Sequence, residues 1–455
     1  MAHVYIGCGA GFSGDRFDAA VPVVSTLATL SGPRFLIYEV LAERTLAIAQ
    51  RLRRENPDQG YSPFLDRYLP LVLADCHRHG IRIVTNMGSA NPVGGARRIL
   101  ELARGLGLNK LRVAAVTGDD LLAVMSEAQV REQPTLEGID VGNRPILAAN
   151  IYLGAQCIAA ALAQNADVVL VGRTTDAALS LGPLLHCFGW GTDEFDRLAQ
   201  GTVCGHLLEC GAQVTGAYYP DPGFKDVPNL ANVGFPIAQI DDGGSLIISK
   251  AADTGGLVSR ATVIEQLLYE VHDPHNYLTP DVTLDLGDVE VQDVGENRVR
   301  VSGARGKPPP ETLKATVCLD TGWLGEGEIS YAGPNALARA ELAAGIVKQR
   351  CKAIGIEETV RVDVLGTQAI FDDNARQRRQ RLAPAPDSEY RVRAAVRSLD
   401  RVVAQQVSDE VLSLYCSGPA GGAGVRQSVT PQIGTASTLV AREYARPTVT
   451  VLEAP

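Results

Sequence analysis

The sequence lacks the features that mark disulfide-stapled, secreted and membrane-spanning proteins. Its nine cysteines stand singly, their count is odd and no CxxC pair occurs, which favours reduced thiols over a disulfide framework. The longest apolar stretches, such as CIAAALA at 157–163, fall short of the roughly 20 residues that a transmembrane helix needs. The opening MAHVYIGCGAGF has neither the charged nor the apolar region of a secretory signal. We therefore expect a cytoplasmic protein without a membrane partner.

Basic residues are outnumbered by acidic ones, 42 to 52. The formal net charge is −10, which argues against a nucleic-acid partner, because such a partner needs a basic face. Local basic runs exist, notably RQRRQR at 376–381, which is better explained as a solvated helix or loop. Low-complexity tracts and repeats of 20–50 residues are absent. With 455 residues, 45% of them hydrophobic, the chain is expected to fold into two domains.

The first 225 residues alternate short apolar runs with helical patterns. The runs that we interpret as strands are HVYIGC (3–8), RFLIYEV (34–40), GIRIVTNMG (80–88), LRVAAVTGDD (111–120) and ADVVLVGR (166–173). The helical patterns between them are at 16–30, 41–54, 94–107 and 152–165. This alternation is typical of an α/β domain with a doubly wound, mostly parallel, Rossmann-like sheet. Ligands bind beyond the carboxyl ends of such strands, so the five strand ends form one candidate site.

Residues 226–455 show a different pattern and predict an α+β domain. The segments 282–306 and 312–320 alternate apolar and polar residues and are interrupted by glycine and asparagine, as in an antiparallel meander. A helix is expected over 336–355 and a closing strand over 448–454. The glycine-rich loop SGPAGGAG at 417–424 could cradle an anion, close over the first domain's site, or be a plain turn.

A glycine motif follows the first predicted strand, in IGCGAGFSGDR (6–16). The residues that could hold an anionic group there are Gly9, Gly11, Ser13 and Gly14. The spacing matches the dinucleotide fingerprint, and Glu39, 25 residues after the last glycine, stands near where a ribose-binding acid belongs. Asp15 would repel a pyrophosphate at close range. An NAD(P) or flavin cofactor, the phosphates of coenzyme A or a carboxylate, and a purely structural turn all remain open.

Polar side chains also follow the third predicted strand, in TNMGSANPVGG (85–95). Asn86, Ser89 and Asn91 offer neutral hydrogen-bonding groups beside a helix start, and Pro92 suits its first position. These groups could bind a carbonyl or carboxylate. A well-capped helix with an Asx-type turn explains them equally well.

Carboxylates and an arginine follow the last two predicted strands. Asp119 and Asp120 are adjacent after one strand, and one of them could cap the next helix. Arg173 and Asp176 follow the other strand. The arginine could grip a substrate carboxylate or phosphate, or it could form an internal pair with the aspartate.

The stretch CGHLLEC (204–210) concentrates reactive side chains. If it is helical, His206 lies on one face with Glu209 and Cys210. An acid–base pair of His206 and Glu209 is one interpretation, and a buried helix with a satisfied histidine is another. A divalent metal is less favoured, because the cluster supplies at most three ligands and matches no zinc signature. Cys210 as a nucleophile is a minor variant.

Several long motifs together resemble the acyclic terpene utilisation (AtuA) family. They include IGCGAGFSGDR, YEVLAERTLA, TNMGSANP, VGRTTDAALSLGPL, GHLLECGAQVTG and YAGPNALARAEL, and the likeness extends from residue 4 to the final GPAGGAGV. One departure is Ala217, where the family pattern suggests a glycine. The resemblance implies catabolism of acyclic terpenoids such as citronellol and geraniol, often as coenzyme A thioesters. It carries over no catalytic residues, and it implies a small companion subunit, because some members have a further C-terminal domain.

Three functions remain open from the sequence. The favoured one is a lyase or hydratase acting on a carboxylic acid or its acyl-CoA thioester, with a proton exchanged by His206 and Glu209 and water activated by Asp119 or Asp176. The second is an NAD(P)-dependent oxidoreductase, and the third is a non-catalytic subunit that serves a partner enzyme. We also expect a homo-oligomer, as is common for soluble chains.

Overall fold

A computed structural model describes residues 3–366 and 389–453, and every structural statement below concerns these residues. They form two compact units: Met1–Gly142, Ile146–Cys318 and Thr435–Pro455 make the larger, Asn143–Pro145 and Leu319–Gly434 the smaller. The boundary predicted near residue 225 lies inside the larger unit. The basic run at 376–381 lies outside the described residues.

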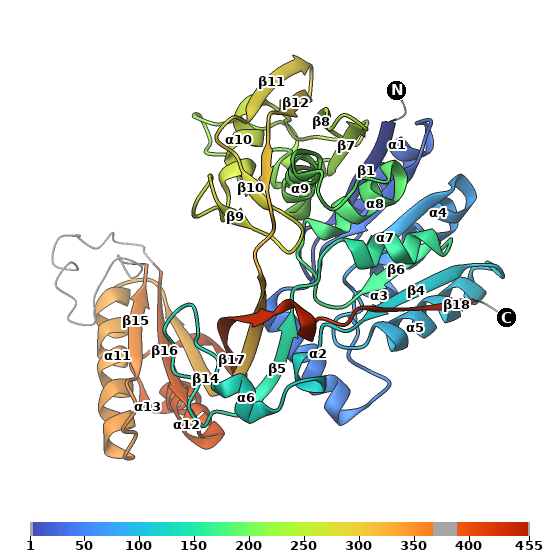
Figure 1. The fold of residues 1–455 in the computed structure, drawn as a ribbon. Helices are drawn as coiled ribbons and strands as arrows, with labels where there is room; N and C mark the ends of the chain where they lie inside the picture. The colour runs from blue at the N-terminus through green and yellow to red at the C-terminus, as the bar shows by residue number, and fades with distance from the viewer. Residues whose placement is uncertain (1–2, 367–388, 454–455) are drawn as a thin grey trace. The chain divides into compact units, whose positions relative to one another are not determined.

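The larger unit is built on a sheet of ten strands, in the order β11-β12-β8-β7-β1-β2-β3-β6-β4-β18 (Figure 1). Its parallel block contains β1 (His3–Ala10), β2 (Arg34–Tyr38), β3 (Ile81–Thr85), β6 (Val168–Val171) and β4 (Arg112–Thr117). The antiparallel strands are β7 (Pro236–Asp241), β8 (Leu246–Lys250), β12 (Arg298–Ser302), β11 (Glu290–Gly295) and β18 (Thr448–Glu453).

The five strands expected in the first half are therefore confirmed, but the expectation of a mostly parallel sheet is wrong. Strands β7 and β8 extend the sheet from β1, and β12 and β11 from the meander in the second half follow by pairing of β12 with β8. The closing strand β18 pairs with β4 at the other edge (Figure 1). Strand edges with unpaired backbone groups are open to such additions. A Rossmann-like arrangement is not confirmed, because its strand order is 3-2-1-4-5-6, whereas this block runs β1-β2-β3-β6-β4.

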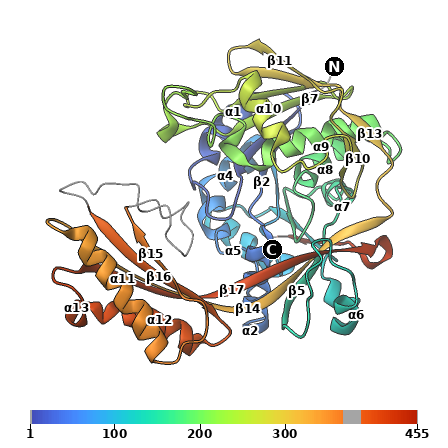
Figure 2. The same ribbon diagram turned by 90° about the vertical axis from the view of Figure 1, so that its left-hand side faces the viewer.

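Helices pack on both faces of the parallel block. One set contains α1 (Ala20–Ala28), α4 (Leu73–His79) and α5 (Pro92–Gly105), and the other contains α7 (Gln156–Ala163), α8 (Ala178–Phe188) and α9 (Phe195–Glu209). Figure 2 shows α1 and α4 on one side of β2 and α8 and α9 on the other. The strands are consequently buried on both faces; β6, for example, is buried along its whole length. This burial explains why their sequences are continuously apolar.

Further elements of the larger unit lie outside the ten-stranded sheet. They are α2 (Glu43–Glu55), α3 (Leu65–Tyr68), α6 (Glu127–Arg131), β5 (Ile146–Ile151), α10 (Arg260–Leu268) and a three-stranded sheet of β9 (Tyr277–Leu278), β10 (Thr283–Asp285) and β13 (Arg305–Lys307). The sequence pattern did not predict α6 or β5.

The smaller unit is a helix-covered antiparallel sheet with its own core. Its strands follow the order β15 (Arg361–Leu365), β16 (Tyr390–Ser398), β14 (Thr312–Tyr331) and β17 (Ala423–Ala441), and β14 and β17 also contribute residues to the larger unit. Its helices are α11 (Ala336–Ala353), α12 (Arg401–Leu412) and α13 (Leu414–Ser417). The glycine-rich loop precedes β17 and is tied to α11, because Arg339 Nη1 donates to Ala420 O at 2.7 Å.

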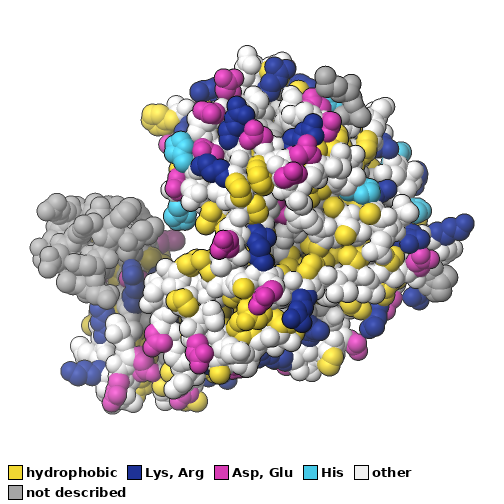
Figure 3. Space-filling view, in the orientation of Figure 1, with side chains coloured by type: hydrophobic (Ala, Val, Ile, Leu, Met, Phe, Trp, Pro, Cys, Tyr) yellow, Lys and Arg dark blue, Asp and Glu magenta, His cyan; other side chains and the backbone are white. Residues whose placement is uncertain are grey.

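Figure 3 shows acidic and basic side chains intermixed over the face of the larger unit that it draws, without a large region of one sign. None of the helices in the described ranges combines the length and apolar character needed to cross a bilayer.

Candidate functional site

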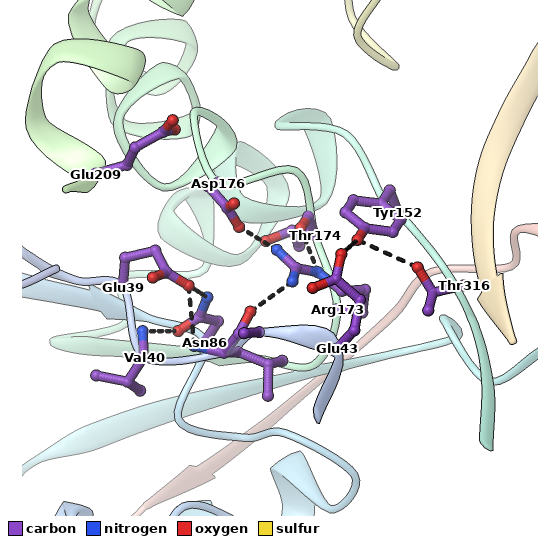
Figure 4. A network of polar contacts seen from close by, with 12 residues as sticks. Glu39, Val40, Glu43, Asn86, Tyr152, Arg173, Thr174, Asp176, Glu209 and Thr316 are labelled. Atoms are coloured by element: carbon purple, nitrogen blue, oxygen red, sulfur yellow. Dashed lines mark hydrogen bonds and ion pairs between the residues drawn. The ribbon is translucent and has the colours of Figure 1, made fainter. Parts of the chain in front are cut away.

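A buried arginine lies at the carboxyl end of the parallel block. Arg173 follows β6 and is 1% exposed. Its Nη2 forms an ion pair with Asp176, its Nε donates to Thr174 O at 2.7 Å and its Nη1 donates to Leu41 O (Figure 4). The Tyr152 ring lies 4.5 Å from the guanidinium carbon. The protein thus satisfies all three guanidinium nitrogens, and the arginine holds Asp176 in place.

Glu39 lies beside this pair and keeps its proton near neutral pH. Its Oε1 accepts from Leu41 N and from Asn86 Nδ2, both at 2.9 Å, and Asn86 Oδ1 in turn accepts from Val40 N at 2.8 Å (Figure 4). Burial, and secondarily the charge of Asp176, raise the pKa of Glu39 to about 8, against the opposing pull of Arg173. Since two donors already occupy Oε1, the proton belongs on Oε2.

Asp176 is more exposed than Glu39, with 38% of its side chain open to solvent. Withdrawal from bulk water raises its pKa above the ordinary value, while the ion pair with Arg173 favours the charged form. Glu39 and Asp176 therefore have the same chemistry but different environments. Such a pair can divide the roles of acid and base.

The predicted pair of His206 and Glu209 is formed on α9. His206 Nδ1 lies 3.0 Å from Glu209 Oε1, and His206 Nε2 lies 3.2 Å from Leu267 O. A carbonyl only accepts, so Nε2 carries a hydrogen, and one further proton is shared between Nδ1 and Glu209. Burial lowers the pKa of His206, but Glu209 more than compensates, so it is raised overall. Burial also raises the pKa of Glu209.

Both imidazole nitrogens are thus engaged, and Glu209 is the member of this pair that can reach a ligand. Its side chain is 13% exposed, against 4% for His206. The charge of Asp176 acts on Glu209 and on Glu39, and Figure 4 shows the three carboxyl groups in one region of the site.

A second polar chain borders Arg173 and was missed from the sequence. Tyr152 Oη donates to Glu43 Oε1 at 2.5 Å and accepts from Thr316 Oγ1 at 3.3 Å (Figure 4). Burial raises the pKa of Glu43, but several interactions lower it, the largest being the hydrogen bond from Tyr152. The pKa of Glu43 is therefore below its ordinary value. Glu43 lies in the YEVLAER motif, so it was a visible candidate, whereas Tyr152 follows the unpredicted strand β5.

Asp119 supports the backbone of the site. Its Oδ2 accepts from Arg173 N at 2.9 Å and from Asn150 Nδ2 at 2.8 Å, and burial raises its pKa to about 6. Its neighbour Asp120 accepts from Leu122 N at 3.1 Å, which is the capping role expected for one of the two.

The glycine motif packs tightly in this structure. A Cβ on Gly9 would lie 2.5 Å from the Tyr38 ring, and one on Gly11 would lie 2.4 Å from the Cys210 backbone. The Gly11 amide donates to Asp15 Oδ2 at 2.9 Å, so the protein itself occupies this donor. A further observation does not favour a phosphate cradle: α1 begins only at Ala20, six residues after Gly14, so its N-terminus does not directly follow the motif. Ser13, between the last two glycines, is partly buried.

The polar residues predicted in the loop after β3 lie in different places. Asn86 joins the site through Glu39. Asn91 caps α5 instead: its Oδ1 accepts from Gly94 N at 3.0 Å, and its amide donates to Pro57 O and Gln59 O. Ser89 is buried in the intervening turn with φ +47°.

The thiols near the site are protonated. Burial raises the pKa of Cys204 and of Cys210 to about 12, so neither has thiolate character. Within the described ranges, no three His, Cys, Asp or Glu side chains come together in a way that could hold a metal ion.

The family of the chain follows from comparison with known proteins. Residues 4–451 match the family described as acyclic terpene utilisation family protein AtuA. No curated protein and no solved structure matches the chain. Since the match covers nearly the whole length, the chain belongs to the acyclic terpene utilisation family.

Proposed function

We propose that this protein is an enzyme of acyclic terpenoid catabolism, a lyase or hydratase that acts on a carboxylic acid or its acyl-CoA thioester. Family membership associates it with terpene utilisation. One observation supports the chemistry: Glu39 holds a proton near neutral pH, while Asp176, paired with Arg173, is the more exposed carboxyl group beside it. Perturbed acids and bases that converge on one site are typical of catalysis.

In the proposed hydration, Asp176 accepts a proton from water as the water oxygen bonds to the β-carbon of an α,β-unsaturated substrate. Electron density moves to the carbonyl oxygen, where Glu39 donates a hydrogen bond from Oε2. The proton shared by His206 and Glu209 then passes from Glu209 to the α-carbon. Transfer of the proton on Asp176 back to Glu209 restores the site, and the reverse sequence eliminates water.

The remaining predicted residues have supporting roles in this scheme. Arg173 positions Asp176, and Asp119 positions the Arg173 backbone. We therefore assign water activation to Asp176 in preference to Asp119. The alternative of an NAD(P)-dependent oxidoreductase has less support, because the Gly11 amide is already bonded to Asp15. A non-catalytic subunit would leave the clustered acids without a task, and buried ionisable groups are costly.

Hydrogen exchange tests the proposal directly. The protein is incubated in D₂O with a branched saturated acyl-CoA and with the matching α,β-unsaturated thioester, and mass spectrometry measures deuterium at the α-carbon and addition of water. We expect exchange or hydration that falls by at least about 100-fold in Asp176→Asn and Glu209→Gln, as for loss of a general acid or base.

Glu101→Gln is the matched control, because this carboxylate is 54% exposed and lies on α5. The proposal would be refuted if the protein catalysed neither α-proton exchange nor hydration with any terpenoid thioester or free acid. Equal rates in Asp176→Asn, Glu209→Gln and Glu101→Gln would refute the residue assignment. The expected homo-oligomer and small companion subunit are further proposals, and light scattering of the purified protein tests the first.

A further inference from the structure

A hollow of about 330 Å³ opens on the larger unit at the C-terminal end of α2. We call it the arginine hollow, and its lining includes Gln50, Arg53, Arg54, Asp120, Leu122 and Leu147. All of these residues belong to the larger unit. The proposed mechanism uses none of them.

Two guanidinium groups are fixed at the wall of the arginine hollow. Arg53 Nη1 donates to Ala90 O at 2.5 Å, and Arg54 Nη1 and Nη2 both lie 3.3 Å from Ile146 O. In the part of the chain that the structure describes, neither arginine forms an ion pair with a carboxylate. The backbone contacts hold both side chains while leaving N–H donors unused, and such donors suit the oxygens of a phosphate.

Gln50 adds a neutral hydrogen-bonding group to the arginine hollow. It is 8% exposed and lines the arginine hollow, yet its side-chain amide has no hydrogen-bond partner among the described residues. The amide atoms themselves are not fully enclosed by protein, so they face the open side of the hollow, where phosphate oxygens could accept from the amide N–H groups. Asp120 also lines the hollow, but Leu122 N already engages its carboxylate, and the two arginines leave a net positive charge.

The arginine hollow and the acid cluster lie at opposite ends of the same two elements. Glu43, the first residue of α2, accepts from Tyr152, which follows β5, whereas Arg54 near the helix end contacts Ile146, the first residue of β5. At 1.5 Å per residue, Glu43 and Arg54 are about 16 Å apart along α2. A phosphopantetheine arm spans a comparable distance between its phosphate and its thioester sulfur.

We propose that the arginine hollow binds the phosphate groups of a coenzyme A thioester whose acyl end lies at Glu39 and Asp176. The inference rests on the proposed function for the identity of the acyl end. Arg53, Arg54 and Gln50 supply the phosphate contacts. The hollow thereby selects carrier-bound substrates over the free acids.

Titration calorimetry with coenzyme A, inorganic pyrophosphate and pantetheine tests the site on the full chain. We expect coenzyme A and pyrophosphate to bind competitively and pantetheine to bind at least about tenfold more weakly, since it lacks the charged contacts. Arg53→Gln and Arg54→Gln should each weaken coenzyme A by about tenfold or more. Arg51→Gln is the control, because this arginine lies on the same helix, has a 43% exposed side chain and does not line the hollow.

A gain in binding provides a test that misfolding cannot imitate. Asp120→Asn keeps an acceptor for Leu122 N but removes a negative charge, so it should bind pyrophosphate several-fold more tightly. Three results would each overturn the proposal: no binding of coenzyme A or pyrophosphate, equal binding by pantetheine, or unchanged affinity in both arginine variants. Binding at the hollow without α-proton exchange would instead refute the proposed chemistry and leave the site standing.

Discussion

His206 Nδ1 lies 3.0 Å from Glu209 Oε1, one turn along α9, while the opposite imidazole nitrogen faces the carbonyl of Leu267. The histidine is therefore fixed at both ends, in a helix segment that is almost wholly buried. In the proposed mechanism, His206 is therefore a positioning residue that shares a proton with Glu209, and Glu209 is the group that acts on the substrate.

Substitutions of Glu209 and of His206 should lower the free energy of unfolding by different amounts. Glu209→Gln can still donate an amide hydrogen to Nδ1, so we expect a loss of less than about 1 kcal/mol in the free energy of unfolding. His206→Ala leaves a buried carboxyl and a carbonyl without partners and creates a cavity, so we expect a loss of about 3 kcal/mol. Urea denaturation measures both, and equal losses would contradict the shared-proton geometry.

The raised pKa of Glu39 predicts a specific dependence of stability on pH. Its pKa is about 8 in the folded protein, against an ordinary value of 4.5, so the folded state binds this proton more tightly than the unfolded state. The resulting stabilisation is complete below about pH 4.5. As the pH rises from there through 8, the free energy of unfolding falls by up to about 1.4 kcal/mol per pH unit.

Thermal denaturation between pH 7 and 9 should therefore show a falling midpoint for the wild type and a smaller fall for Glu39→Gln. The glutamine side chain in this variant would keep the oxygen that accepts from Leu41 N and Asn86. Asp119 and Asp281, whose pKa values are about 6, titrate mostly below this range. Parallel curves for the two proteins would show that Glu39 is ionised throughout.

The sequence predicts which residues come together at this site better than it predicts the topology of the sheet that positions them. Each strand of the parallel block is buried on both faces, so its apolar run and its polar end were visible locally. Glu39 and Asn86 are hydrogen-bonded, and Arg173 is linked to Glu39 through the backbone of Leu41. Periodicity reports only how each segment is buried. The antiparallel additions at β7 and β18 depend on pairing between distant segments, which no local pattern records.

Tyr152 shows the same limit at the level of one residue. It follows β5, whose sequence ILAANI has two alanines and an asparagine, and these residues are weak strand formers. Its partner Glu43 is 109 positions away. From the sequence, Arg173 could either bind a substrate anion or form an internal pair with Asp176. Only the acceptors around the guanidinium group favour the internal pair.

Replacing Arg173 tests whether it is a structural cation. A lysine ammonium cannot reach Thr174 O, Leu41 O and Asp176 together, so Arg173→Lys should cost about 3 kcal/mol in the free energy of unfolding. Arg51→Lys, at an exposed position of α2, should change it by less than about 0.5 kcal/mol. A stable Arg173→Lys protein with weakened ligand binding would restore the substrate-gripping role.

Two helical glycines should respond in opposite directions to alanine. Gly205 lies inside CGHLLEC on α9, where a Cβ would come within 2.5 Å of Ala177 Cα and O, next to Asp176. Alanine there must separate α9 from the turn that carries Asp176, so we expect a loss of about 2 kcal/mol despite the better helix propensity of alanine. Gly345, in the interior of α11, has nothing within 4 Å of an added Cβ. Gly345→Ala should therefore raise the free energy of unfolding by about 0.5–1 kcal/mol.

Urea denaturation of both variants, with tryptophan fluorescence and circular dichroism as probes, compares them under identical conditions. The contrast matters for function because the close approach at Gly205 places the helix of His206 and Glu209 against the turn of Asp176. If Gly205→Ala were as stable as the wild type and kept its proton-exchange activity, α9 could shift without disturbing the site. The tight packing would then be incidental, and the positions of the carboxyl groups would have to depend on Arg173 and Asn86 alone.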